Sequence, residues 1–103
     1  MEPMPKLTEI DDPIADDLWS YVDEAGTKNF TRIMVGRPRL IPGDLNKDWF
    51  CPLRLDAQYP SIQSIGGTGP VDALMNAMGV VKAFFDEHRE VTPRETPPSP
   101  VTK

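Results

Sequence analysis

The sequence of 103 residues contains a single cysteine, Cys51, and a single histidine, His88. One thiol cannot form an intramolecular disulfide or build a zinc site from cysteines, so apolar burial must stabilise the fold. Cys51 alternates with apolar residues, which is typical of a buried small hydrophobe rather than a nucleophile. His88 falls near the predicted end of a helix, where it complements the helix dipole. We therefore name no catalytic residue, no metal site and no cofactor, and the residues favour a non-enzymatic protein.

Long apolar runs and an excess of basic residues are also absent. No run approaches the roughly 18 residues that cross a bilayer, and the mean hydropathy is -0.40. The first residues lack the basic and apolar regions of a secretory signal, so we expect a cytoplasmic location without membrane association. Acids outnumber bases by 16 to 11, which gives a net charge of -5. This balance disfavours a nucleic-acid partner, because nucleic acid attracts basic surfaces.

Twelve prolines are unevenly distributed and divide the chain into arms and a core. Residues 1–17 carry one base and six acids and form an acidic N-terminal arm. Residues 92–103 include four prolines and little apolar surface, which is typical of a disordered tail. Residues 18–91 remain as a single domain. A domain of that size buries only about 60% of its unfolded surface, which favours self-association.

Four segments of the core have the composition of strands, at 18–22, 30–37, 49–56 and 61–65. Apolar side chains occupy both faces of 30–37, so we expect a helix over one face and a subunit or an arm over the other. The third segment contains Pro52, which cannot donate a backbone hydrogen bond. Pro52 must therefore lie at a bulge or direct its nitrogen away from a partner strand.

A helix is predicted from about Pro70 to about Arg89, with a proline at its start and Asp72 in its first turn. Two neighbouring apolar rows run along it: Ala73, Ala77, Val80 and Phe84, and Leu74, Met78, Val81 and Phe85. Together these rows cover a wider arc than one sheet face buries, so part of the helix needs another cover. The predicted fold class is α+β, a β-β-β-β-α order with a small antiparallel sheet of about four strands and one long C-terminal helix packed on it.

Two sets of residues are candidates for binding. The first could hold an anion through backbone amides and guanidinium groups, and comprises Gly67, Thr68, Gly69, Arg37 and Arg39. The glycine-rich turn lacks the Gly-Lys-Ser/Thr ending of a P-loop, and the arginines could instead pair with the acidic arm. The second set could form an apolar interaction surface, or its aromatic members could fill the core: Trp49, Phe50, Met78, Val81 and Phe85.

Three short motifs resemble a group of small bacterial proteins that is classed only as a domain of unknown function. They are Gly36-Arg37-Pro38 closing a strand, Asp48-Trp49-Phe50-Cys51-Pro52 opening the next, and the helix start Val71-Asp72-Ala73-Leu74-Met75-Asn76-Ala77-Met78 after a glycine-rich turn. The likeness covers residues 30–88. It implies a bacterial source and a compact fold, and no activity or site residue.

Three functions are open from the sequence. The first is a non-enzymatic module that associates with itself, as a homo-oligomer, or with a protein partner through surplus apolar surface. The second is a small-ligand or phosphate-binding domain that uses the glycine-rich turn with Arg37 and Arg39. The third is a regulator that neutralises another protein through its acidic arm. The first is favoured, because the predicted sheet leaves part of the apolar helix uncovered.

Overall fold

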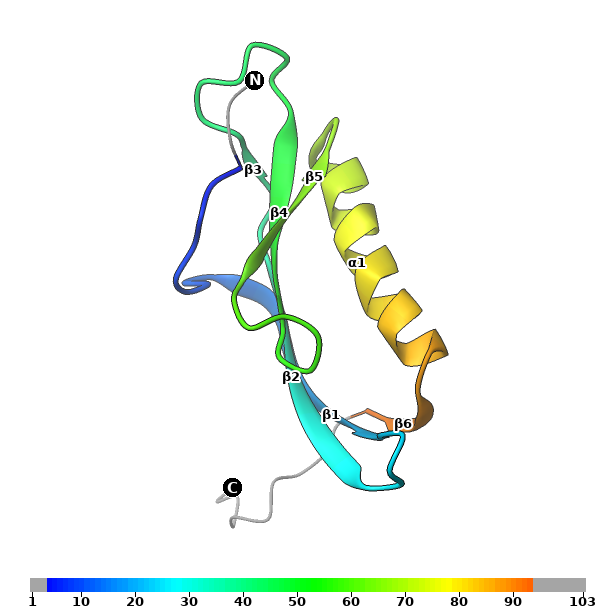
Figure 1. The fold of residues 1–103 in the computed structure, drawn as a ribbon. Helices are drawn as coiled ribbons and strands as arrows, with labels where there is room; N and C mark the ends of the chain where they lie inside the picture. The colour runs from blue at the N-terminus through cyan, green and yellow to red at the C-terminus, as the bar shows by residue number, and fades with distance from the viewer. Residues whose placement is uncertain (1–3, 94–103) are drawn as a thin grey trace.

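The computed structural model describes residues 4–93 and contains an antiparallel sheet of six strands with one helix across it (Figure 1). The elements in chain order are β1 (Pro13–Val22), β2 (Lys28–Gly36), β3 (Arg39–Leu40), β4 (Trp49–Leu55), β5 (Gln63–Gly67), α1 (Pro70–Asp86) and β6 (Arg89–Thr92). The predicted α+β class is confirmed. The expected number of four strands is wrong, because β3 and β6 are only two and four residues long and carry no strand pattern in the sequence.

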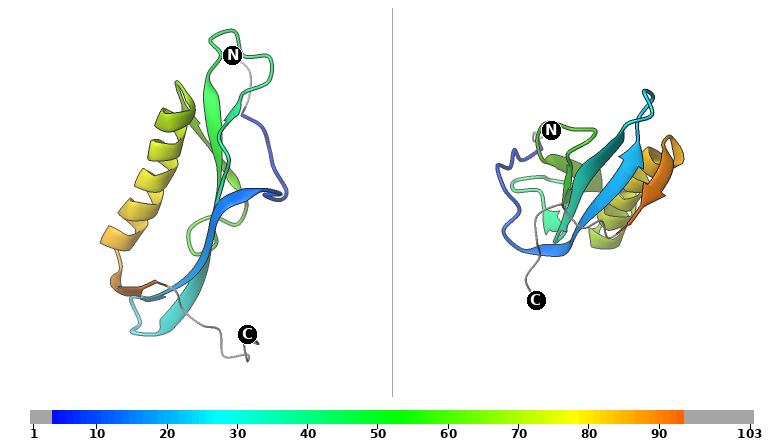
Figure 2. Two further views of the ribbon diagram at one scale, coloured as in Figure 1. Left: turned by 180° about the vertical axis from the view of Figure 1, so that it is seen from behind. Right: turned by 90° about the horizontal axis from the view of Figure 1, so that it is seen from below.

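The strand β4 organises the sheet. One of its edges pairs with β2 and then β3, and its other edge pairs with β5. The remaining neighbours are β1 beside β2 and β6 beside β1, and all of these pairs are antiparallel. The helix α1 leads the chain from β5 back to the far edge, where β6 adds next to β1. Figure 2 shows that the sheet is strongly curled, with the helix over one face.

The paths of β2 and β3 are interrupted where they pass Pro52. Val35 pairs with Leu53 and Arg39 pairs with Phe50, so four residue steps on the β2–β3 side oppose three steps on β4. This extra residue is a bulge, and it leaves Pro52 without a partner residue on that edge. The missing amide hydrogen of Pro52 therefore interrupts no regular ladder there, as the sequence requires.

The main core lies between the sheet and α1. Leu53 and Leu55 of β4 and Ala73 and Ala77 of α1 are completely buried in it. The two alanines have short side chains, so they allow the helix to lie close to the sheet. The whole cluster comprises Ile33, Val35, Cys51, Leu53, Leu55, Ala73, Ala77, Val81 and Phe84.

Residues 4–12, which we call the N-terminal arm, cover the second face of the sheet (dark blue in Figure 1). Met34, Phe50 and Pro52 lie on this face and are buried. The Ser64 hydroxyl donates a hydrogen bond of 2.6 Å to the carbonyl of Pro5, which anchors the arm to β5. The strand β2 is therefore covered by the helix on one face and by the arm on the other, which is the arrangement expected from its apolar residues.

Several element ends differ from the expected ones. The first strand begins at Pro13 instead of residue 18, because residues 13–17 pair with β2. The helix ends at Asp86 instead of Arg89, and β6 begins at Arg89. Glu90, whose φ is 52°, lies within β6, where the pairing with β1 is irregular. Of the tail expected at 92–103, Thr92 ends β6 and residues 94–103 lie outside the described residues.

Candidate functional site

The outward side of α1 carries an exposed row of residues spaced four apart. Val71 is 69% exposed and Met75 is 65% exposed. The row continues through Gly79, where an added Cβ would meet no atom within 4 Å, to the exposed Ala83. We call Val71, Met75, Gly79 and Ala83 the outer row. It consists of two large apolar side chains followed by two small residues, on the side of the helix that the sheet does not cover.

The residues predicted as an interaction surface are separated by the structure. Phe50 is buried on the arm side of the sheet. Val81 is buried on the side of α1 that faces the sheet. Trp49 and Phe85 are half-buried, and Phe85 stacks on Trp19 with 4.2 Å between ring centroids. Met78 is 45% exposed and borders the outer row.

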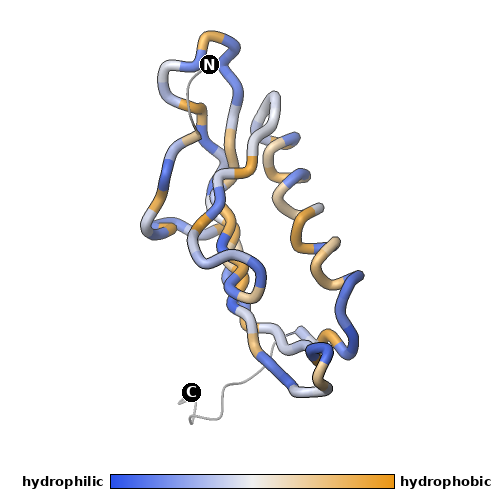
Figure 3. The backbone as a smooth tube through the Cα atoms, viewed as in Figure 1, coloured by the Kyte–Doolittle hydropathy of each residue, from blue (hydrophilic) through white to orange (hydrophobic). Residues whose placement is uncertain are grey.

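Of the two apolar rows predicted along the helix, only Met78 is exposed, because the other seven residues are buried or half-buried against the sheet. The exposed apolar residues Val71 and Met75 lie outside those rows, and the sequence prediction missed them. The spacing of four that links them to Gly79 and Ala83 was the available signal. Figure 3 shows apolar residues distributed along α1 as well as along the strands beside it. Because apolar residues occur on more than one side of α1, their spacing alone did not separate the buried row of the helix from the exposed row.

The glycine-rich turn already holds a negative group of the chain itself. The amide of Thr68 donates a hydrogen bond of 2.9 Å to a carboxylate oxygen of Asp72, and Pro70 removes one amide from the first turn. Gly67 packs tightly against the backbone of Ala73, and Gly69 precedes the helix with an extended backbone. The carboxylate of Asp72 thus lies where an external anion would meet the helix dipole.

Arg37 and Arg39 lie on the opposite face from this turn. Arg39 pairs with Phe50 and shares its arm-side face, whereas a Cβ on Gly67 would point at the helix. Both guanidinium groups contact Asp12 of the arm, Arg39 at 2.9 Å and Arg37 at 3.5 Å. The hydrogen bond from Arg39 is the main cause that lowers the pKa of Asp12. The glycine-rich turn and the two arginines, predicted from the sequence as one anion site, are therefore not brought together. Asp12 of the arm pairs with both arginines.

The structure gives Cys51 and His88 local structural contacts. The Cys51 thiol is completely buried on the helix side of β4, with its sulfur 3.4 Å from the carbonyl oxygen of Gly36. Burial raises the pKa of the Cys51 thiol to about 11. The imidazole Nδ1 of His88 lies 2.7 Å from the carbonyl of Phe84 in the last turn of α1. Because a carbonyl only accepts, Nδ1 carries the proton in this contact.

We expect Cys51 to react with a disulfide reagent at pH 8 at least about 100-fold more slowly in the native protein than in the urea-unfolded chain. The raised pKa alone lowers the thiolate fraction by about that factor, and burial adds to it. The measurement is the rate of thiol labelling with and without urea. Similar rates in both states would mean that β4 opens readily and that Cys51 is not part of a closed core.

Within residues 4–93, no group of three or more histidine, cysteine or acidic side chains is placed to hold a metal ion. No helix in this part of the chain has the length and apolar character needed to cross a membrane. Comparisons with protein-family models, with curated proteins and with solved structures find no match for this chain. The resemblance to a bacterial group of unknown function stays an expectation.

Proposed function

We propose that the protein is a non-enzymatic self-association module in which the outer row of α1 packs against the same row of a second copy. The order of residues in that row carries the proposal. Large side chains occupy its N-terminal half and small residues its C-terminal half, so the row is complementary to itself when two copies run antiparallel.

The two-fold relation can be followed residue by residue. With the two helices antiparallel and centred at the level of Ala77, Val71 of one copy faces Ala83 of the other, and Met75 faces Gly79. Packing of rows spaced by four residues brings helices together at about -50°, with about 8 to 10 Å between their axes. The open space at Gly79 accommodates the thioether of the facing Met75. A single symmetric contact thus fills the open space at Gly79 in both copies, as in an isologous dimer.

Charges do not oppose this contact. The outer row has no ionisable residue, so no charged side chain lies at the centre of the proposed contact. Next to it, Lys82 pairs with Asp86 at 2.8 Å, and Asp72 accepts a hydrogen bond from Thr68. Methionine is enriched at the centres of protein interfaces and charged residues are depleted there. The row therefore resembles an interface centre with a polar rim.

The experiment compares the molar mass of the wild-type protein and of Met75→Glu by light scattering after gel filtration at about 100 μM. We expect a dimer for the wild-type protein. We expect a monomer for Met75→Glu, with a dimer dissociation constant raised by about 100-fold or more, because the contact would bury an unpaired carboxylate.

The matched control is Leu45→Glu, because Leu45 is 97% exposed in a loop away from α1. It should remain dimeric, and circular dichroism should show that both variants keep the fold. A wild-type protein that is monomeric at this concentration, or a Met75→Glu variant that remains dimeric, would overturn the proposal.

A further inference from the structure

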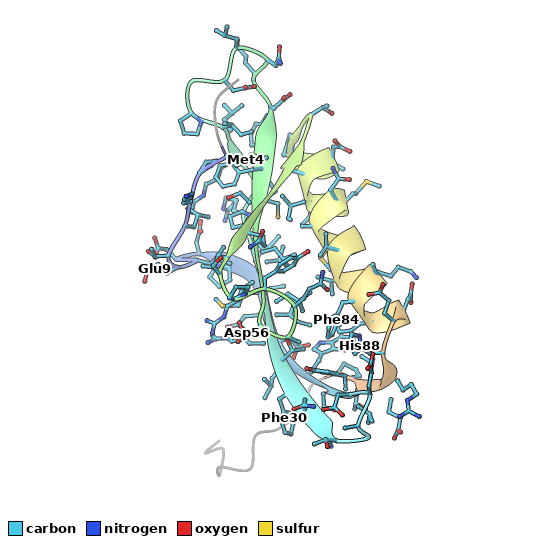
Figure 4. The ribbon with its side chains drawn as sticks, in the orientation of Figure 1. Met4, Glu9, Phe30, Asp56, Phe84 and His88 are labelled. Carbon is cyan, nitrogen blue, oxygen red and sulfur yellow. The ribbon has the colours of Figure 1, made fainter. Side chains whose placement is uncertain are left out.

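A second feature lies on the opposite face of the sheet, away from the outer row. A cleft of about 520 Å³ separates the N-terminal arm from the sheet. Arm residues 7–10 form one wall, and residues 59–62, between β4 and β5, form the other. In Figure 4, Glu9 and Asp56 mark its two sides. The volume falls within the range of small-molecule sites, about 300 to 1,000 Å³.

The floor of the cleft combines two arginines with a methionine. Arg54 on β4 pairs with Met34 on β2, so both side chains project from the arm side of the sheet. Arg32 lies two residues before Met34 and therefore shares that face. Each arginine makes a bidentate contact with one carboxylate: Arg32 with Asp16 at 3.0 and 2.7 Å, and Arg54 with Asp56 at 2.7 and 3.2 Å.

The floor of the cleft holds unused hydrogen-bond donors, next to the carboxylates of Glu9 and Asp56 in the lining. A guanidinium group has five N–H donors, and the described contacts of Arg32 and Arg54 use two on each. The hydroxyl of Tyr59 accepts a 3.0 Å hydrogen bond from Gln58. Among the described residues that hydroxyl has no acceptor for its own proton. A ligand group that suits this set must accept hydrogen bonds, as a carboxylate does, and the cleft already shows that geometry in Asp56 on Arg54.

The same cleft offers apolar surface next to these donors. Met34 is 8% exposed and forms part of the floor, while the half-buried Leu7, Ile10 and Ile62 belong to the walls. We infer that the cleft binds a small amphipathic carboxylate, with its head group on Arg54, Arg32 and Tyr59 and its apolar body against Met34 and the arm. The exposed Arg54–Asp56 pair is readily exchanged for such a head group, because exposed ion pairs contribute little stability.

Glu9 allows a test in which the affinity for an anionic ligand is expected to increase. Glu9 belongs to the arm wall, and the neighbouring Asp11 raises the pKa of its carboxyl by a hydrogen bond and by repulsion. When ionised, Glu9 repels an anionic ligand. Glu9→Gln should therefore tighten binding, an outcome that damage to the fold would not produce.

The probe is octanoate, titrated into the ¹⁵N-labelled full chain and followed by amide chemical shifts. We expect saturable shifts in the arm and around Met34, and none of comparable size with 1-octanol or octylamine at the same concentration. Arg54→Met should weaken octanoate binding by about tenfold or more, and Glu9→Gln should strengthen it severalfold.

The matched control is Arg37→Met, because Arg37 contacts Asp12 outside the cleft; it should leave the affinity within about twofold. Met75→Glu should also leave it unchanged, so that failure here is separate from failure of the proposed dimer. The inference is overturned if octanoate causes no saturable shifts, if octylamine or 1-octanol binds equally well, or if Arg54→Met and Glu9→Gln leave the affinity unchanged.

Discussion

Gly67→Ala is expected to lower the free energy of unfolding by about 3 kcal/mol, at the upper end of overpacking substitutions. Gly67 ends β5 beneath the first turn of α1, and a Cβ built there would lie 2.6 Å from the Cα of Ala73. Backbone atoms of a helix cannot rotate away as a side chain can. The helix would have to move off β5 and lose part of the packing of Ala73 and Ala77. Urea unfolding, followed by tryptophan fluorescence, measures the change.

The neighbouring Gly66→Ala is the matched control. A Cβ at Gly66 would lie 2.6 Å from the terminal methyl of Met4, which is the end of a flexible side chain. Since that methyl can rotate away, we expect a change within about 1 kcal/mol. Equal destabilisation by both substitutions would show that the loss of glycine in β5, and not the contact with the helix, determines the effect.

The glycine-rich turn shows what the sequence could predict and what it could not. Pro70 and Asp72 mark the helix start locally, and the start is found at Pro70 as expected. The role of Gly67 depends on how closely a distant part of the fold approaches it. A glycine that makes room for a helix and a glycine that makes room for a phosphate leave the same pattern in a sequence.

Among the strands, too, some are predicted by local sequence and others depend on the rest of the fold. The second and third strands, predicted at 30–37 and 49–56, are found close to those limits because apolar and β-branched residues mark them. The strand β6 has no such pattern: Val91 is its only apolar residue, and its pairing with β1 follows from the direction in which the chain leaves the helix. The arm lacks any periodicity, and its place on the sheet depends on contacts at Gly36, Ser64 and Gly66.

The candidate site could be anticipated only in part, for a related reason. The apolar rows predicted on the helix are covered except at Met78, and the orientation of the helix on the sheet decides which other apolar residues remain outside. Ala73 and Ala77 set that orientation, because their short side chains permit the closest approach to β4 and β5. Once they face the sheet, Val81 is buried with them, and Val71 and Met75 turn outward. The spacing of four marks the row through Ala73 and Ala77 as well as the row through Val71 and Met75, so it does not by itself decide which of the two rows faces the sheet.

Phe84→Ala is expected to lower the free energy of unfolding by about 3 to 5 kcal/mol, as for other buried phenylalanines. Phe84 is 3% exposed and fills the space between the last turn of α1 and β1. Its ring meets Tyr21 edge-on at 5.3 Å between centroids and lies 4.1 Å from the ring of His88. Loss of the ring removes the buried apolar area and the ring contacts with Tyr21, His88 and Phe85, and leaves a cavity where the helix meets β1. Urea unfolding measures the effect, and Phe84→Leu gives a smaller, measurable loss if the alanine variant does not fold.

Phe30→Ala provides the matched control, since Phe30 is 42% exposed on β2 and loses the same atoms in the substitution. The side chain of Phe30 buries less apolar area than that of Phe84, so we expect Phe30→Ala to lower the free energy of unfolding by less than about 1 kcal/mol. The difference between the two variants isolates the contribution of the junction between α1 and β1. If Phe84→Ala were no worse than Phe30→Ala, the end of the helix would not be held by that junction. The orientation of α1, on which the exposure of the outer row depends, would then have to be set by Ala73 and Ala77 alone.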